Sequence, residues 1–212
     1  MFDLARGVTD RFLTMPSYGI AAMFILVLYA VQIEIRFGAK ARAMRGGAWD
    51  RGSTIALSLA SAVPLIGFFL AMEGRIPMAL PGMPAVAWVG VLLGALGFVL
   101  RLLSLLVLRE RFTRTLLIQQ GHQLERNGPY RFVRHPGYLG SLLCLNGIGL
   151  ASGNTFTVVA SVVVTFAAYR YRIRVEDAML VSAFGDSYEE YRRSVGALVP
   201  WSAGKKIHSM RP

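Results

Sequence analysis

Residues 138–169 read YLGSLLCLNGIGLASGNTFTVVASVVVTFAAY and contain no Asp, Glu, Lys or Arg. A helix needs roughly 20 mostly apolar residues to cross a hydrocarbon layer about 30 Å thick, so this block is too long for one crossing. Near its middle stands the small polar cluster Ala151-Ser152-Gly153-Asn154, which suits a tight turn. The block therefore predicts a helical hairpin of two short membrane spans.

Three further apolar blocks precede the hairpin, at residues 18–35, 53–72 and 84–108. Each is long enough for a helix that satisfies its own backbone hydrogen bonds while it crosses a bilayer. The sequence therefore predicts an all-α, polytopic integral membrane protein with about five transmembrane helices. Residues 1–17 mix charged and apolar side chains without the order of a signal peptide, and we expect an interfacial segment there.

The composition excludes an ordinary water-soluble domain. Hydrophobic residues make up 54% of the chain and charged residues 17%, and the mean hydropathy is +0.48; a soluble domain has about 25% charged residues. The net charge of +11 would suggest a nucleic-acid partner in a soluble protein, but here the basic residues lie between apolar blocks, so we expect none. Cys144 is the one cysteine, which excludes an intrachain disulfide and a thiolate zinc site, and we expect no metal.

Loop charges predict the orientation of the spans. The segments at 36–51, 109–134 and from Arg170 onward are basic, whereas the loop before residue 84 holds only Glu73 and Arg75. Because Lys and Arg in short loops stay on the cytoplasmic side, we expect the basic segments to face the cytoplasm and the N-terminus to be external. The membrane is then the cytoplasmic membrane of a bacterium or, in a eukaryote, the endoplasmic reticulum.

Two polar segments flank the hairpin, at residues 121–140 and 170–191. The first is rich in Gly and Pro and predicts a rigid, irregular loop that leads into a membrane helix. Its arginines and tyrosines could simply anchor the chain at the lipid headgroups, but that alternative does not account for His135, which stands between Arg134 and Pro136 at the start of a span.

The second polar segment combines charged and aromatic positions at helical spacing. Arg172 and Glu176 are four residues apart and share a face, and Phe184, Tyr188 and Tyr191 form an aromatic stripe. Alternatively, Arg172 and Glu176 form only an ion pair on the helix surface, worth a few tenths of a kcal/mol, and the aromatic residues only pack against the membrane-facing side.

Arg101 interrupts the third apolar block. An intramembrane arginine is costly, so it either extends to the headgroups from a span that ends near Leu100, or faces a polar cavity between helices. The sequence leaves both alternatives open.

Residues 128–140 follow the pattern GPYRxxRHPxYxG, preceded by His122 and followed after the hairpin by Arg172-x-x-x-Glu176. This ordered set resembles the isoprenylcysteine carboxyl methyltransferase family and the related phospholipid methyltransferase-like integral membrane methyltransferases. The resemblance extends over residues 101–200. The same core occurs in thiol methyltransferases and, more distantly, in membrane sterol reductases, so it specifies the architecture better than the substrate.

No linker is long or polar enough to mark a second domain, so we expect one membrane domain over residues 1–212. Residues 1–100 would hold the interfacial segment and membrane helices, and the resemblance implies that residues 101–212 form the catalytic half. It implies S-adenosyl-L-methionine as the cofactor. The implied cofactor pocket consists of His122, Gln123, Leu124, Glu125, Tyr130, His135, Pro136, Gly137, Tyr138 and Glu176. Arg134 is added as a cation for the cofactor carboxylate, and Arg172 would hold the acceptor. Arg172 and Glu176 are the candidate catalytic residues.

Methyl transfer from a sulfonium is an in-line displacement that mainly requires positioning. A carboxylate acceptor, such as that of a prenylated cysteine-like lipid, needs no base and only an arginine to orient it, for which Arg172 is the candidate. An amine or thiol acceptor would need a base, Glu176 or His135. The open alternatives are phospholipid N- or thiol S-methylation, an NADPH-dependent sterol reductase-like protein, and a scaffold bound to anionic lipid.

Overall fold

The computed structural model describes residues 50–76, 83–108 and 124–200, and these residues are mostly helical. Their elements are α4 (Ser53–Met72), α5 (Met83–Leu108), the short 3₁₀ helix η2 (Gly128–Arg131), α6 (Pro136–Ala151), α7 (Thr155–Phe184) and α8 (Asp186–Ser194). Within these three ranges no strand forms, and an isolated bridge joins Val133 to Gly196.

The predicted spans agree closely with the helices. α4 has the predicted bounds, α5 begins one residue before the predicted block, and the predicted hairpin is confirmed by α6 and α7 with a turn between them. By length and apolar composition α4, α5 and α7 can each cross a membrane. The predicted first span at 18–35 lies outside the described residues.

The two arms of the hairpin are unequal, which corrects the prediction of two short spans. α6 has 16 residues, whereas α7 has 30 and continues well past the apolar block. The polar segment after residue 169 continues the helix until Gly185, whose φ of 53° ends it. Arg172 and Glu176 therefore lie on the same helix as the span.

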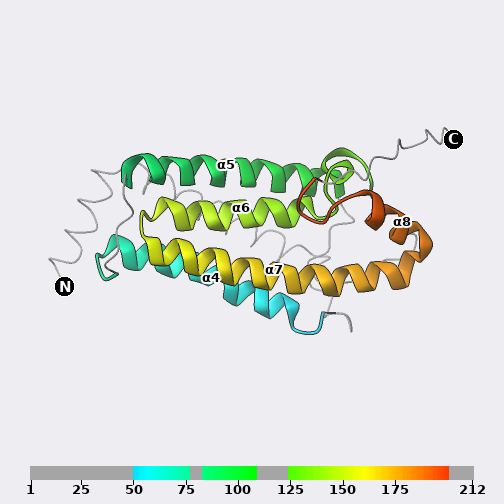
Figure 1. Ribbon diagram of the computed structural model, residues 1–212, viewed down its shortest axis with the longest axis horizontal. Helices are drawn as coiled ribbons and strands as arrows, with labels where there is room; N and C mark the ends of the chain where they lie inside the picture. Colours follow the sequence, from blue (N-terminus) through cyan, green and yellow to red (C-terminus); the bar gives the residue numbers. More distant parts are fainter. Residues whose placement is uncertain (1–49, 77–82, 109–123, 201–212) are drawn as a thin grey trace, which may run out of the picture.

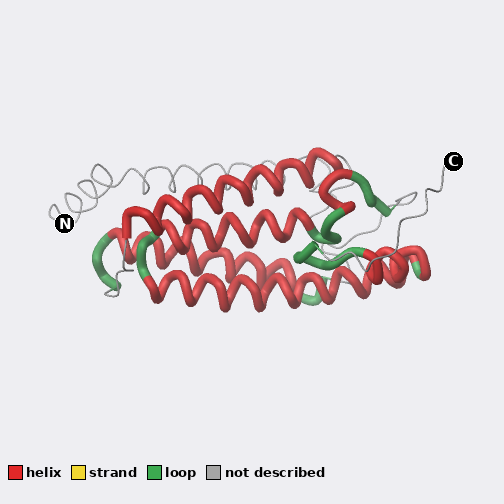
Figure 2. Tube along the Cα trace, turned by 45° about the horizontal axis from the view of Figure 1, so that its top comes forward, coloured by secondary structure: helices red, strands yellow, loops and turns green. Residues whose placement is uncertain are grey.

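The long helices run side by side along the longest axis of the molecule (Figures 1 and 2). α6 lies between α5 and α7 and also packs against α4, while α4 packs against α7. The α6–α7 turn lies at one end of the bundle, and η2 and α8 lie at the other (Figure 1). This arrangement brings residues before α6 and residues after α7 to the same end.

Glycines bring the backbones of α5 and α6 into direct contact. A Cβ at Gly140 would lie 2.6 Å from the Gly97 carbonyl oxygen and 2.7 Å from the Arg101 amide nitrogen. A Cβ at Gly147 would likewise lie 2.6 Å from the Gly90 carbonyl oxygen. Small residues at helix contacts are typical of membrane bundles, where close packing replaces the hydrophobic effect as the source of association.

Apolar side chains cover the outside of the bundle, and polar ones lie inside it. Leu59, Leu96 and Val163 are 68%, 65% and 61% exposed. Inside, Asn146 donates a hydrogen bond to Thr165, which is fully buried. A distribution of this kind suits a lipid environment, and the protein is an integral membrane protein.

Candidate functional site

The segment that leads into α6 is held by the segment that follows α8. The amide of Arg134 donates to the Gly196 carbonyl at 2.8 Å, and the amide of His135 donates to the Ala197 carbonyl at 3.0 Å. Upstream, Gly128 adopts a φ of 56° that favours glycine, and η2 begins there. This irregular loop was expected from the sequence, and the backbone bonds hold it in one shape.

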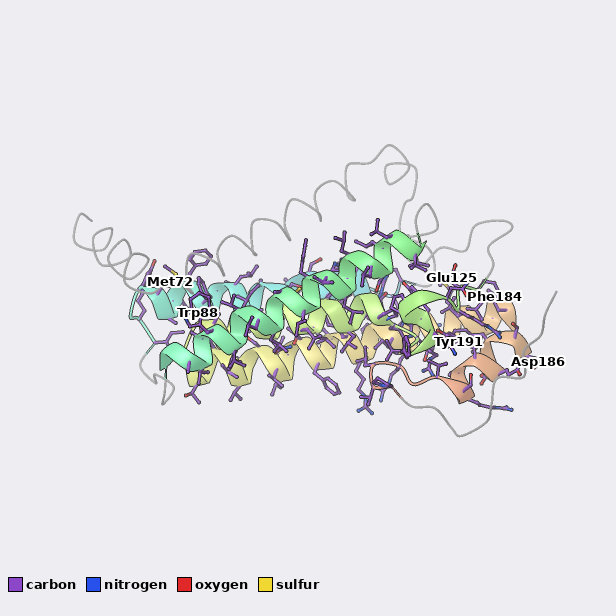
Figure 3. All side chains as sticks on the ribbon, turned by 90° about the horizontal axis from the view of Figure 1, so that it is seen from above. Met72, Trp88, Glu125, Phe184, Asp186 and Tyr191 are labelled. Carbon is purple, nitrogen blue, oxygen red and sulfur yellow. The ribbon has the colours of Figure 1, made fainter. Side chains whose placement is uncertain are left out.

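Side chains from the loop, α7 and α8 meet at this end of the bundle. Figure 3 shows Glu125, Phe184, Asp186 and Tyr191 there, far from Met72 at the opposite end. The predicted polar segments therefore lie at the end of the bundle that holds α8.

His135, Tyr138, Glu176 and Arg172 form one continuous polar cluster. The Tyr138 hydroxyl donates to Glu176 Oε2 and accepts from Arg172 Nε at 3.0 Å. His135 Nδ1 lies 3.9 Å from Glu176 Oε2, and the His135 ring stacks on Tyr138 with centroids 5.4 Å apart. The predicted meeting of the two polar segments is thus present in the fold.

Asp177 accepts hydrogen bonds from three side chains. His135 Nε2 lies 2.8 Å from its Oδ1, Arg134 Nη2 donates to its Oδ2 at 3.1 Å, and the Tyr188 hydroxyl donates to its Oδ1. These donors come from the loop before α6 and from α8. Asp177 therefore fastens both segments to α7, a role that was not expected from the sequence.

Arg172 is 2% exposed and is bonded to the beginning of α4. Its Nη1 lies 2.7 Å from Asp50 Oδ1, 2.6 Å from Ser53 Oγ and 3.2 Å from Thr54 Oγ1. Burial raises the pKa of Asp50, but the hydrogen bonds from Thr54 and Arg172 outweigh it and hold the pKa below the usual value. Asp50 was not predicted as a site residue. The sequence feature that could have identified it is its place as the one acidic residue in a basic segment next to a span.

The other predicted residues that the structure describes lie around this cluster. Glu125 accepts from its own loop, through the Asn127 amide at 3.0 Å. Leu124 packs against the aromatic cluster of α8. Tyr130 is buried, and its carbonyl accepts from the Tyr191 hydroxyl. His122 and Gln123 lie outside the described residues.

Arg134 is held by protein groups at both ends of its guanidinium. Besides the bond to Asp177, its Nη1 donates to the carbonyls of Arg192 at 2.8 Å and Val195 at 2.7 Å. These bonds fix the end of α8 beside the loop. They favour a structural role for Arg134 over contact with a ligand.

Two predicted pocket residues, Pro136 and Gly137, stand at the start of α6. Pro136 is buried, and Gly137 contacts Arg101. Arg101 is 9% exposed; its Nη1 donates to the Gly137 carbonyl at 3.3 Å and to the Ser141 hydroxyl. The first alternative for Arg101 is wrong, because α5 continues past Leu100 to Leu108 and the buried arginine is bonded to the neighbouring helix α6. Its Nε has no hydrogen-bond partner among the described residues.

The buried tyrosines of this end keep their protons at neutral pH. Burial raises the pKa of Tyr130 and of Tyr188 far above the usual value, and it raises the pKa of Tyr191 to about 12. Each hydroxyl is therefore available as a hydrogen-bond donor. Tyr188 and Tyr191 use this capacity to tie α8 to Asp177 and to the loop.

Comparisons with known proteins agree with this geometry. Residues 85–187 match the model of the phospholipid methyltransferase family. Protein-S-isoprenylcysteine O-methyltransferase of Tribolium castaneum is 30% identical over 132 residues, which are 60% of this chain and 47% of that protein. A probable protein-S-isoprenylcysteine O-methyltransferase of Oryza sativa subsp. indica is 33% identical over 118 residues, 55% of this chain and 62% of that protein.

A solved structure gives the same result for the fold. The structure of a eukaryotic intramembrane Ras methyltransferase, an isoprenylcysteine carboxyl methyltransferase, aligns with a TM-score of 0.57 and 26% identity over 70% of this chain and 53% of the other. The chain spans from about half to somewhat under two thirds of the length of these relatives. The resemblance predicted from the sequence is confirmed: the chain is related, in sequence and in fold, to the isoprenylcysteine carboxyl methyltransferases and to the wider group of phospholipid methyltransferase-like membrane proteins.

Proposed function

We propose that this protein is an integral membrane methyltransferase that uses S-adenosyl-L-methionine and O-methylates the carboxylate of a prenylated cysteine-like lipid. The observation that carries the proposal is the polar cluster of His135, Tyr138, Glu176 and Arg172 at one end of an apolar helix bundle. Such a position gives a water-soluble donor and a lipid-dissolved acceptor access to the same groups. From the loop charges, we place this end at the cytoplasmic face.

The chemistry of the donor set fits S-adenosylmethionine. Its ammonium group needs an anion; the Glu176 side chain is 22% exposed, and its carboxylate lies 3.9 Å from the His135 ring. Its adenine needs apolar and aromatic walls, which Leu124, Tyr130 and Tyr138 supply. The remaining predicted positions, His122, Gln123, Glu125, Pro136 and Gly137, lie along the same segment and complete the proposed pocket.

When bound, S-adenosylmethionine supplies an electrophilic methyl group on sulfur. The acceptor oxygen forms the new bond to carbon as the carbon–sulfur bond breaks, so no side chain has to act as a nucleophile. The protein has to hold the two reactants in line and exclude water. An ionised carboxylate acceptor also needs no base.

Arg172 is the proposed partner of the acceptor carboxylate. Asp50, Ser53 and Thr54 hold its Nη1 from the α4 side, so the guanidinium has a fixed orientation before any substrate arrives. Arginine suits this task because its planar guanidinium matches a carboxylate. An acceptor carboxylate has to share Arg172 with Asp50, and this makes Asp50 part of the proposed acceptor site.

A phospholipid amine is the second candidate acceptor, because the matched family model is that of the phospholipid methyltransferases. An amine has to lose a proton on methylation, and Glu176 or His135 would accept it. The two candidates therefore differ in their need for a base.

The test is transfer of a labelled methyl group from S-adenosylmethionine by the purified full chain to a prenylcysteine, phosphatidylethanolamine and an alkyl thiol. We expect labelling of the prenylcysteine and none with Glu176→Gln. Labelling of phosphatidylethanolamine alone would establish the second candidate. Calorimetric titration separates the remaining classes: binding of NADPH without S-adenosylhomocysteine indicates a reductase, and binding of neither by the folded protein indicates a scaffold.

A further inference from the structure

Two adjacent carboxylates on α7 contact the two nitrogens of one imidazole ring. Asp177 Oδ1 lies 2.8 Å from His135 Nε2, and Glu176 Oε2 lies 3.9 Å from His135 Nδ1. The proposed function uses Glu176 and His135 but gives Asp177 no task. Their surroundings differ, because Arg134 pairs with Asp177, whereas the Tyr138 hydroxyl donates to Glu176.

The contacts of Asp177 determine which nitrogen of His135 carries a proton. A carboxylate in an ion pair with an arginine accepts hydrogen bonds and donates none. Its Oδ1 also accepts from the Tyr188 hydroxyl. The short contact to His135 Nε2 is therefore a hydrogen bond only if Nε2 holds a hydrogen, which leaves Nδ1 as the ring atom that can accept one.

The ring is also held in place by its other neighbours. The His135 amide is bonded to the Ala197 carbonyl, and the ring lies parallel to Tyr138 with an interplanar angle of 7°. These contacts fix the position of the ring. Its tautomer is determined by the groups that contact its two nitrogens. Nδ1, which then holds the lone pair, lies 3.9 Å from Glu176 Oε2 in the polar cluster.

We propose that Asp177 is a positioning residue that holds His135 in the Nε2–H form, so that Nδ1 and Glu176 together receive an N–H group of a ligand. The identity of the ligand rests on the proposed function, whereas the tautomer of His135 does not depend on it. Two sources supply the N–H chemistry: the α-amino group of S-adenosylmethionine and the amine of a phospholipid headgroup. In both, a carboxylate and a ring lone pair complement a cationic donor.

The substitution Asp177→Asn reverses the tautomer while it keeps the shape of the side chain. The amide oxygen of the variant turns toward Arg134, because the opposite orientation would place its NH₂ group against a cation. The NH₂ group then faces His135 Nε2, which can accept its hydrogen bond only without a proton of its own. The ring proton moves to Nδ1, as in other histidines whose orienting aspartate is replaced by asparagine.

Nitrogen-15 NMR of histidine-labelled full chain, without ligand and at slightly alkaline pH, measures the tautomer directly. The chain has 3 histidines, and the spectrum of His135→Gln assigns the resonance. We expect a protonated Nε2 in the native protein and a protonated Nδ1 in Asp177→Asn. The matched control Tyr188→Phe removes another donor of Asp177 and leaves the native tautomer. A native ring with a proton on Nδ1, alone or on both nitrogens, overturns the proposal even if Asp177→Asn fails to fold.

Ligand titrations of the native protein test the second half of the proposal. The Nδ1 resonance is expected to shift with S-adenosylhomocysteine but not with 5′-methylthioadenosine, which lacks the amino acid end; a shift with a phosphoethanolamine detergent instead assigns the lipid amine. Binding of S-adenosylhomocysteine to Asp177→Asn should weaken about tenfold, the value of one hydrogen bond. Binding without any Nδ1 shift overturns the N–H assignment, whereas absence of nucleotide binding with the predicted tautomer contradicts only the proposed function.

Discussion

Replacing Asp50 by Asn tests how Arg172 is held. The change removes the charge opposite a guanidinium that is 2% exposed, while the amide oxygen can still accept from Thr54 and Arg172. Loss of one partner from a buried ion pair costs about 3–5 kcal/mol, but the Asp50 side chain is 17% exposed. With that exposure and the retained hydrogen bonds, we expect about 1–3 kcal/mol of lost unfolding free energy.

The assay is reversible unfolding of the purified chain in mixed micelles, as a double-mutant cycle with Arg172→Met. We expect the double variant to be more stable than the sum of the single effects predicts, with a coupling energy of about 1–3 kcal/mol. Glu189→Gln is the matched control, because it also neutralises one carboxylate but breaks a pair with Arg192 at 3.2 Å whose two side chains are 27% and 44% exposed. This control should lose no more than about 0.5 kcal/mol.

The pH dependence of this pair follows from the lowered pKa of Asp50. A carboxyl group whose pKa falls on folding stabilises the folded state above its unfolded pKa, and this contribution is lost as the pH falls through the folded value. The unfolding free energy of the native chain should therefore fall below about pH 4 more steeply than that of Asp50→Asn. Additive single variants, or identical acid profiles, would refute the claim that Asp50 holds Arg172.

Three further predictions concern the polar cluster and the helix contact. Glu176→Gln and Arg172→Ala should abolish methyl transfer while membrane insertion, measured by membrane extraction, is unchanged; full activity of either variant with a lipid acceptor removes its proposed role. Tyr138→Ala should raise the dissociation constant of S-adenosylhomocysteine more than it lowers the saturated rate, and kinetic titration distinguishes the two effects. Gly140→Ala should lower the unfolding free energy by about 1–3 kcal/mol, because its Cβ would lie 2.7 Å from the Arg101 amide nitrogen, and an unchanged denaturation midpoint would contradict the backbone contact.

The spans could be predicted because a membrane helix is defined by a local property, an uninterrupted apolar length. The turn at 151–154 was found for the same reason, since a small polar cluster inside an apolar block favours a turn over a continuous span. The continuation of α7 to Phe184 was not predicted, because a polar segment after a span can continue as helix or end it. Gly185 predicts where α7 ends only if the helix is already known to continue that far.

The meeting of His135 with Glu176 was predicted from the ordered motif, but the contacts that hold it were not. Arg172 and Asp50 are 122 positions apart, and no local pattern pairs residues at that separation. Asp177 stands next to Glu176 and was not singled out from the sequence. Its separate role depends on the backbone bonds that bring Arg134 and Tyr188 to its two oxygens.

Calorimetric titration of the purified full chain with S-adenosylhomocysteine, compared with Glu176→Gln, tests the central claim that the loop before α6 and the polar half of α7 form one cofactor site. We expect one molecule bound per chain, no binding of NADPH, and a large loss of affinity in the variant. A folded protein that binds no S-adenosylhomocysteine, or whose affinity is unchanged by Glu176→Gln, would contradict it.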